Sequence, residues 1–211
     1  MRKTEAPFFL IILISQRAFR VIISVAAAYI FLTFLALSFR DMDIIQYSSR
    51  WVEVNSIIIT RGGYANIHHF LGPFGMKYLL LPSSLILMAA SGIWVYKYRK
   101  TDIWIQLGVI AIIARLWTYH RLYDDLLILI PIVAVFRLLR SGGLSENQRR
   151  AAVLILILSC LGLLSPAFFL QLQPPLGTLF RTGQAVIWLS MLAFLLYYSY
   201  KASKAGRSET V

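Results

Sequence analysis

The densest group of chemically reactive side chains lies in one short polar segment, residues 115–125, which reads RLWTYHRLYDD. His120 and Asp124 are four positions apart, so they share a face if this part of the segment is helical. Arg121 and Asp125 have the same spacing. A carboxylate beside an imidazole is suited to proton abstraction, and guanidinium groups are suited to holding phosphate. The segment is therefore the first candidate for a functional site.

A plainer interpretation of the same segment is an aromatic belt at a membrane surface, with ordinary ion pairs at a helix end. Its aromatic members would be Trp117, Tyr119 and Tyr123. Two apolar runs flank the segment, at 103–114 and 126–136, and both are short for a membrane crossing. If they form a hairpin, residues 115–125 lie partly below the membrane surface, where ionisable groups are costly and usually functional. This favours the functional interpretation.

The composition excludes a soluble globular protein. The chain has 211 residues, of which 59% are hydrophobic and 14% are charged, and its mean hydropathy is +0.71. Soluble domains have roughly 45–50% apolar and about 25% charged residues. The single cysteine, Cys160, lies inside an apolar run, so neither a disulfide framework nor a cysteine metal site is expected.

Long apolar runs predict an all-α, polytopic transmembrane helix bundle of about six membrane segments, forming one domain over residues 1–211. A hydrocarbon core of about 30 Å takes about 20 helical residues, and four runs reach or approach that length. They are residues 21–39, 79–96, 151–170 and 185–200. Within the third run, Ser165 and Pro166 predict a kink. The apolar run at 6–15 is followed by a basic turn, and we expect it to be the tail of a membrane segment whose beginning is missing.

The distribution of basic residues predicts the orientation. Residues 16–20, 97–102, 137–150 and 201–211 hold 2, 3, 4 and 3 Lys or Arg residues, and we assign them to the cytoplasmic side, the last as a cytoplasmic tail. Residues 40–78, 115–125 and 171–184 then face outward, with all three histidines and five of the nine acids. The net charge of +12 is thereby explained as a topology signal, and nucleic acid is not an expected partner.

The outward loop at residues 40–78 is expected to form amphipathic interfacial helices that cover the 115–125 connector. The alternative for any one of its residues is a solvated position without a role. His68 and His69 lie in this loop, but adjacent side chains diverge on a helix or strand, and no known metal-ligand spacing is present. We therefore expect neither a metal nor another cofactor.

The stretch WTYHRLYDDLLILIP at residues 117–131 resembles the late outward-facing motif of glycosyltransferase family 87. These are polytopic enzymes of the GT-C class, related to mycobacterial mannosyltransferases. The resemblance covers about residues 6–140, because the entry segment at 7–20 is similar to the family's mid-chain cytoplasmic turn. It implies a GT-C-like partial fold and transfer of a hexose, typically mannose, from a polyprenyl-phosphate donor to a lipid or glycan acceptor outside the cytoplasm.

The resemblance also implies roles for individual residues. Arg115 or Arg121 would hold the donor phosphate, and His120, oriented by Asp124, would position or deprotonate the acceptor hydroxyl. Supporting residues would be Tyr119, Tyr123, Asp125, His68 and His69. Enzymes of this class carry an essential acid in their first outward loop, which this chain lacks in the equivalent position. The chain therefore resembles the C-terminal half of such an enzyme, and we do not transfer that role to Asp41 or Asp43.

Two other functions remain open. The chain could be a non-catalytic subunit that completes the site of a second polytopic protein, or a small transporter whose Arg, His and Asp side chains form a solute or proton path. The transporter is less favoured because no internal repeat is evident. In each case we expect a multi-pass protein of a bacterial inner membrane.

Overall fold

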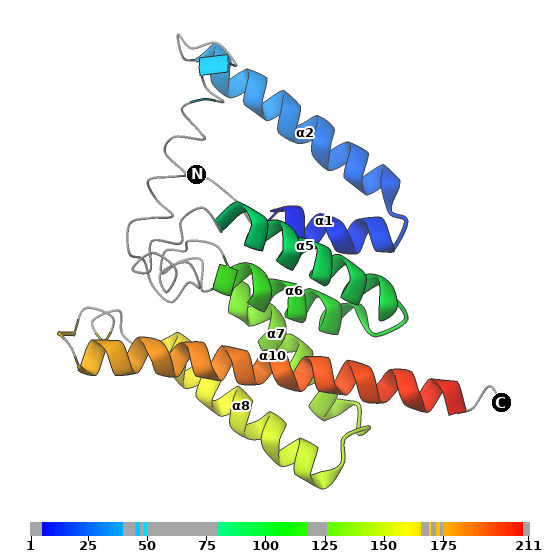
Figure 1. The fold of residues 1–211 in the computed structure, drawn as a ribbon, viewed down its shortest axis with the longest axis vertical. Coiled ribbons are helices and arrows are strands. Elements are labelled where there is room, and N and C mark those ends of the chain that lie inside the picture. The colour runs from blue at the N-terminus through cyan, green and yellow to red at the C-terminus, as the bar shows by residue number, and fades with distance from the viewer. Residues whose placement is uncertain are drawn as a thin grey trace.

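The fold was analysed in a computed structural model, which describes residues 6–39, 45–46, 49, 80–117, 126–165, 169, 172–173 and 175–208. Over these ranges the chain forms seven α-helices and no strand, which confirms the predicted all-α class. Figure 1 shows most of the helices stacked side by side, with α2 inclined away from the rest. The helices are α1 (Ala6–Ser15), α2 (Phe19–Ser38), α5 (Leu80–Lys97), α6 (Ile103–Trp117), α7 (Leu129–Arg140), α8 (Glu146–Leu164) and α10 (Leu176–Ser208).

Three of these helices are long and apolar enough to cross a membrane, among the residues that the structure describes. Their candidate spans are Phe19–Ala36, Glu146–Leu164 and Leu176–Lys204. No residue of the first span is buried, and large side chains such as Phe31 lie on its surface. An apolar surface of that size is stable only against lipid or another apolar surface. The structure thus supports a membrane protein, while the predicted number of about six segments stays a prediction.

Helix α6 occupies the centre of the bundle. It contacts α1, α5, α7 and α10, and nearly all of its side chains from Ile105 to Leu116 are buried. A helix that is apolar on every side is stable when neighbours surround it, and the sequence of α6 has no charged residue before Arg115. With 15 residues it is about 22 Å long, so it stays shorter than the hydrocarbon core, as the sequence predicted.

Helix α6 comes close to two neighbours at Gly108, in the middle of the helix. A Cβ atom at this position would lie 3.1 Å from the Cα of Pro131 in α7 and 3.1 Å from the Cδ1 of Leu195 in α10. Small residues let helix backbones come close together in membrane bundles. Gly108 therefore sets the spacing of α6 from both α7 and α10.

Helix α1 packs onto the centre of the bundle. Its Ile12 is buried in a cluster with Val95 of α5 and with Ile110 and Ala114 of α6. The helix ends in a hydrogen-bonded turn in which the Ala18 N–H donates to the carbonyl oxygen of Leu13 at 2.9 Å. This turn reverses the chain into α2, so the 6–15 segment is a packed element of the bundle.

Local signals at both ends of α8 explain why its limits differ from the predicted 151–170. Ser145 and Gln148 form a capping box, in which the Ser145 N–H donates to the Gln148 Oε1 at 3.0 Å. This cap starts the helix at Glu146, five residues earlier than predicted. At the other end Ser165 is extended, with ψ of 139°, because the residue before a proline avoids the helical region. The prediction of a kink within a longer helix is therefore wrong, since α8 ends at Leu164.

The limits of the other helices differ from the predicted ones by up to nine residues. Helices α2 and α5 match the predicted 21–39 and 79–96 to within two residues. Helix α7 begins three residues later and ends four residues later than the predicted 126–136. Helix α10 is 33 residues long, about 50 Å, and begins nine residues before the predicted 185–200. The polar residues in its first turns, such as Arg181 and Gln184, hid its helical start from a search for purely apolar runs.

The basic loops gather at one end of the bundle, which we call the basic end. Figure 1 shows the α1–α2, α5–α6 and α7–α8 turns and the C-terminal part of α10 all on the right. Contacts agree with this view, because the Lys201 Nζ donates to the Gln148 Oε1 at 3.3 Å. The described parts of the four segments predicted to be cytoplasmic thus lie together, although which side of the membrane they face stays a prediction.

We predict that Gly108→Ala destabilises the protein, by about 1–3 kcal/mol as for other overpacked cores. The added methyl group would push the Pro131 backbone and Leu195 away from α6. Gly183→Ala in α10 is the matched control, because nothing lies within 4 Å of a Cβ atom there and alanine is the better helix former. Thermal unfolding of both variants in one detergent tests this. Equal midpoints for the two variants would contradict the close approach.

We also predict that cysteines placed in separate segments of the basic end react from the same side of the membrane. Suitable single-cysteine variants are Gln16→Cys, Ser141→Cys and Ala202→Cys, with Cys160 replaced by alanine. Gln173→Cys, at the opposite end of the bundle, should react only from the other side. Labelling of sealed, oriented vesicles with a membrane-impermeant maleimide measures this. Mixed labelling among the first three variants would refute the arrangement.

Candidate functional site

Arg115 lies in the last turn of α6 with only 2% of its surface exposed. Its guanidinium carbon lies 4.7 Å from the centre of the Trp188 ring of α10, which is itself 3% exposed. A desolvated guanidinium over an indole face gains about 2 kcal/mol from the cation–π interaction. The stacked ring therefore fixes Arg115 between α6 and α10.

Among the residues that the structure describes, Arg115 is the one charged side chain that is fully buried. Burying a charge in apolar surroundings is expensive, so such residues in membrane proteins pair with other polar groups and mark binding sites or pathways. The resemblance implies that Arg115 or Arg121 holds the donor phosphate. The structure shows Arg115 buried at the end of α6, and its role as a phosphate ligand stays a prediction.

The other predicted site residues lie outside the described residues. The structure therefore does not place them relative to Arg115 or to one another. They are the predicted catalytic residues His120 and Asp124, the second phosphate ligand Arg121, and the supporting residues Tyr119, Tyr123, Asp125, His68 and His69. Over the described ranges, no group of three or more His, Cys, Asp or Glu side chains is placed to hold a metal ion.

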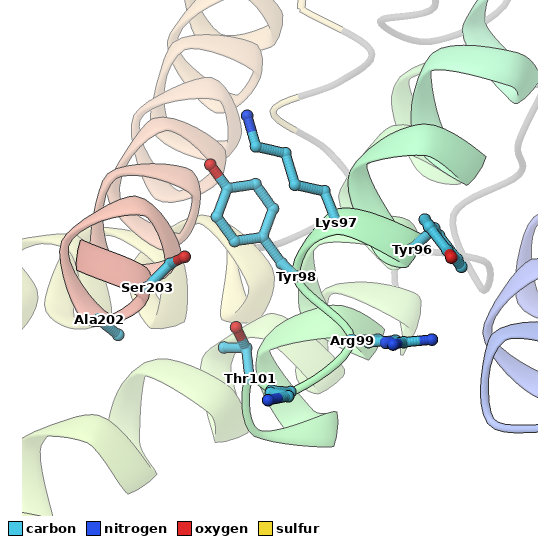
Figure 2. A pocket seen from close by; sticks show the side chains of 8 residues that line it. Tyr96, Lys97, Tyr98, Arg99, Thr101, Ala202 and Ser203 are labelled. Atoms are coloured by element: carbon cyan, nitrogen blue, oxygen red, sulfur yellow. The ribbon is translucent and has the colours of Figure 1, made fainter. Parts of the chain in front are cut away.

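A second cationic site, which the sequence reasoning missed, lies at the basic end. Two adjoining pockets of about 620 Å³ and 680 Å³ surround the α5–α6 turn and share Lys100, Thr101 and Ala202. Figure 2 shows the first of them, where Tyr98 of the turn faces Ser203 of α10. The sequence contains a signal for this site, the run YKYRK at residues 96–100, but the run was interpreted only as a topology signal.

A buried glutamine holds the wall of these pockets in shape. The side chain of Gln106 in α6 is fully buried, and its Nε2 donates to the carbonyl oxygens of Tyr98 at 3.2 Å and Thr101 at 3.1 Å. The Tyr98 carbonyl oxygen also accepts from the Thr101 N–H at 2.9 Å, so Gln106 adds a second donor there and supplies one to Thr101. The turn that carries Lys97, Arg99 and Lys100 is thereby tied to the central helix.

Comparisons with protein-family models, with curated proteins and with solved structures find no match to this chain. The resemblance to glycosyltransferase family 87 therefore rests on the sequence at 117–131 and at 7–20 and stays a prediction.

We predict that Arg115 and Trp188 are energetically coupled. Arg115→Met and Trp188→Leu should each lower the unfolding midpoint, and the double variant should be less destabilised than the sum of the two. The coupling expected from a desolvated cation–π contact is about 1–2 kcal/mol. Denaturant or thermal unfolding of the four proteins in one detergent measures it. Strictly additive effects would show that the stacked geometry contributes nothing to stability.

Proposed function

We propose that this chain is a multi-pass protein of a bacterial inner membrane that acts as a GT-C glycosyltransferase, or as the C-terminal half of one. It transfers a hexose, with mannose as the expected sugar, from a polyprenyl-phosphate donor to a lipid or glycan acceptor on the non-cytoplasmic side. The observation that carries the proposal is Arg115, a cation buried at the end of α6 and fixed by Trp188 where the predicted polar connector begins.

The chemistry of Arg115 fits a lipid-linked phosphate. A guanidinium presents several N–H donors in a planar fork that matches two phosphate oxygens, and it keeps its charge when it is desolvated. As the glycosyl bond breaks, negative charge develops on the departing phosphate, and a fixed cation nearby stabilises that charge. The low dielectric around a buried cation strengthens this effect.

In the proposed mechanism, residues of the 115–125 connector transfer the proton. His120, oriented by Asp124, takes the proton of the acceptor hydroxyl as the oxygen attacks the anomeric carbon. Arg121 shares the phosphate with Arg115, and Asp125 pairs with Arg121. The supporting residues Tyr119, Tyr123, His68 and His69 shape the outward pocket in which the acceptor binds.

Sugar transfer by the purified full chain in vesicles tests the proposal. With polyprenyl-phosphate-[¹⁴C]mannose as donor and membrane lipids as acceptor, we expect labelled product from the wild type. His120→Ala and Asp124→Ala should reduce transfer by about 100-fold or more, the usual contribution of general acid–base catalysis. Arg115→Lys should reduce it by about 100-fold, because a single ammonium replaces the two-pronged contact.

The control variant is Arg149→Gln, which removes an exposed cation at the basic end, far along the chain from the proposed site. It should transfer sugar at the wild-type rate. Thermal unfolding shows whether Arg115→Lys still folds, and binding of sugar-free polyprenyl phosphate separates loss of donor binding from loss of chemistry. Full activity of both His120→Ala and Asp124→Ala would refute the assignment.

A second candidate function, a non-catalytic subunit, is favoured by the exposure of α2. This helix makes its main contact with α1 alone, and no residue of its candidate span is buried, so a second polytopic protein has room to pack against it. Such a subunit would show no transfer by itself and would gain activity when a longer polytopic protein co-purifies with it. Transfer by the isolated chain would exclude this alternative.

A further inference from the structure

Several cations of the basic end lie close together, although a topology signal does not require them to share one place. We call the two adjoining pockets around the α5–α6 turn the basic pocket. Five cationic side chains and one acid, Asp102, line it. The cations are Lys97, Arg99, Lys100, Arg137 and Arg140. Like charges gathered this closely repel one another unless an anion lies between them.

Interactions within the protein engage only some of these cations. The Nη2 of Arg137 lies 3.4 Å from the Oδ2 of Asp102, and its guanidinium carbon lies 5.7 Å from the centre of the Trp104 ring. Lys97 and Arg99 lie over the rings of Tyr98 and Tyr96, respectively.

Lys100 and Arg140 are different. Both are exposed lining residues, and neither has an ion-pair or ring partner among the described residues. Thr101, Ser141 and Ser203 also line the pocket, and the Ser141 hydroxyl donates to the Leu138 carbonyl oxygen at 2.9 Å. Exposed cations beside hydroxyl-bearing residues are the usual lining of a site for phosphate oxygens.

The wall of the basic pocket includes exposed aromatic side chains. Phe136 lines the pocket and is 51% exposed, and Tyr96 is 66% exposed. On α7, the exposed residues Leu129, Val133 and Phe136 are followed by Arg140 at helical spacing, so they form one stripe that leads to the cation. A ligand that fits both parts has a phosphate group and a hydrocarbon chain.

We propose that the basic pocket binds the headgroup of an anionic phospholipid, with the phosphate between Lys100 and Arg140 and an acyl chain along the α7 stripe. Basic pockets between membrane helices, on the side where Lys and Arg accumulate, are suited to such headgroups. The pocket is formed by the turns at the opposite end of α6 from Arg115, so this lipid is distinct from the substrate of the proposed sugar transfer. The inference holds whether or not the chain is a glycosyltransferase.

Lipid binding by the purified full chain in a neutral detergent tests the proposal. Native mass spectrometry and thermal unfolding are recorded with phosphatidylglycerol, with phosphatidylcholine and with inorganic phosphate as separate probes. We expect phosphatidylglycerol to be retained and to raise the unfolding midpoint, because a ligand that binds only the folded state stabilises it. Phosphatidylcholine and inorganic phosphate should have little effect at the same concentrations.

The deciding variant is K100Q/R140Q, which removes the two lining cations that have no ion-pair or ring partner among the described residues. Its apparent affinity for phosphatidylglycerol should fall by about 30-fold, which corresponds to about 1 kcal/mol for each cation near a lipid phosphate. The matched control is R20Q/R149Q, which removes two exposed cations of the basic end that do not line the pocket. The control should keep its affinity within about twofold, and K100R/R140K should keep most of the binding, since the positive charges remain.

Each outcome decides the proposal. Selective loss in K100Q/R140Q, with retention in R20Q/R149Q and K100R/R140K, supports a built headgroup site. Equal loss in both glutamine variants would mean diffuse attraction to the basic end and would overturn it. Stabilisation by inorganic phosphate equal to that by phosphatidylglycerol would also overturn it, because the ligand would then be a free anion and the apolar stripe would contribute nothing.

Discussion

The spacing of α6 from its neighbours is the constraint on which the rest of the bundle depends. At Gly108 the backbone of α6 lies so close to Pro131 and Leu195 that a single added methyl group would meet both. Two turns further along α6, about 10 Å away, the same packing against α10 brings Arg115 over Trp188. In the other direction, Gln106 ties the α5–α6 turn to the central helix. One close contact thus positions groups at both ends of α6.

The two ends of α6 differ in how far their positive charges are exposed to water. At the basic end, exposed lysine and arginine side chains lie over tyrosine and tryptophan rings and line two adjoining pockets. At the opposite end, Arg115 is removed from water and its guanidinium lies over the Trp188 ring. Exposed cations attract an anion at little desolvation cost but are screened by salt, whereas a buried cation acts at short range and strongly. This difference is the physical basis for proposing different partners at the two ends, a membrane lipid at one and a reacting phosphate at the other.

Capping residues and prolines indicate the ends of α8 more accurately than the limits of the apolar runs do. The capping box of Ser145 and Gln148 starts α8 within the polar ENQRR segment, which a search for apolar residues passes over. Pro166 forces Ser165 out of the helical region, so the apolar run continues beyond the end of the helix. For α10, the backbone stays helical from Leu176 through the polar Arg181 and Gln184, because the Gln184 Nε2 finds a partner in the Gly162 carbonyl oxygen, at 3.0 Å. Such partners come from another helix, so the local sequence does not reveal them.

The sequence by itself determined the helical class, the membrane-like composition, the central position in the chain of two short apolar runs, and the accumulation of basic residues in alternate turns. These properties follow from composition and periodicity, which are local. Only the tertiary structure decided that α6 is enclosed by α1, α5, α7 and α10, that Arg115 lies against Trp188, and that Lys100 and Arg140 line one pocket. These pairs are far apart in the chain, and their distances depend on how closely the helix backbones pack. That spacing depends on the missing side chain at Gly108 together with the residues of α7 and α10 that lie against it, so no single segment of the sequence contains it.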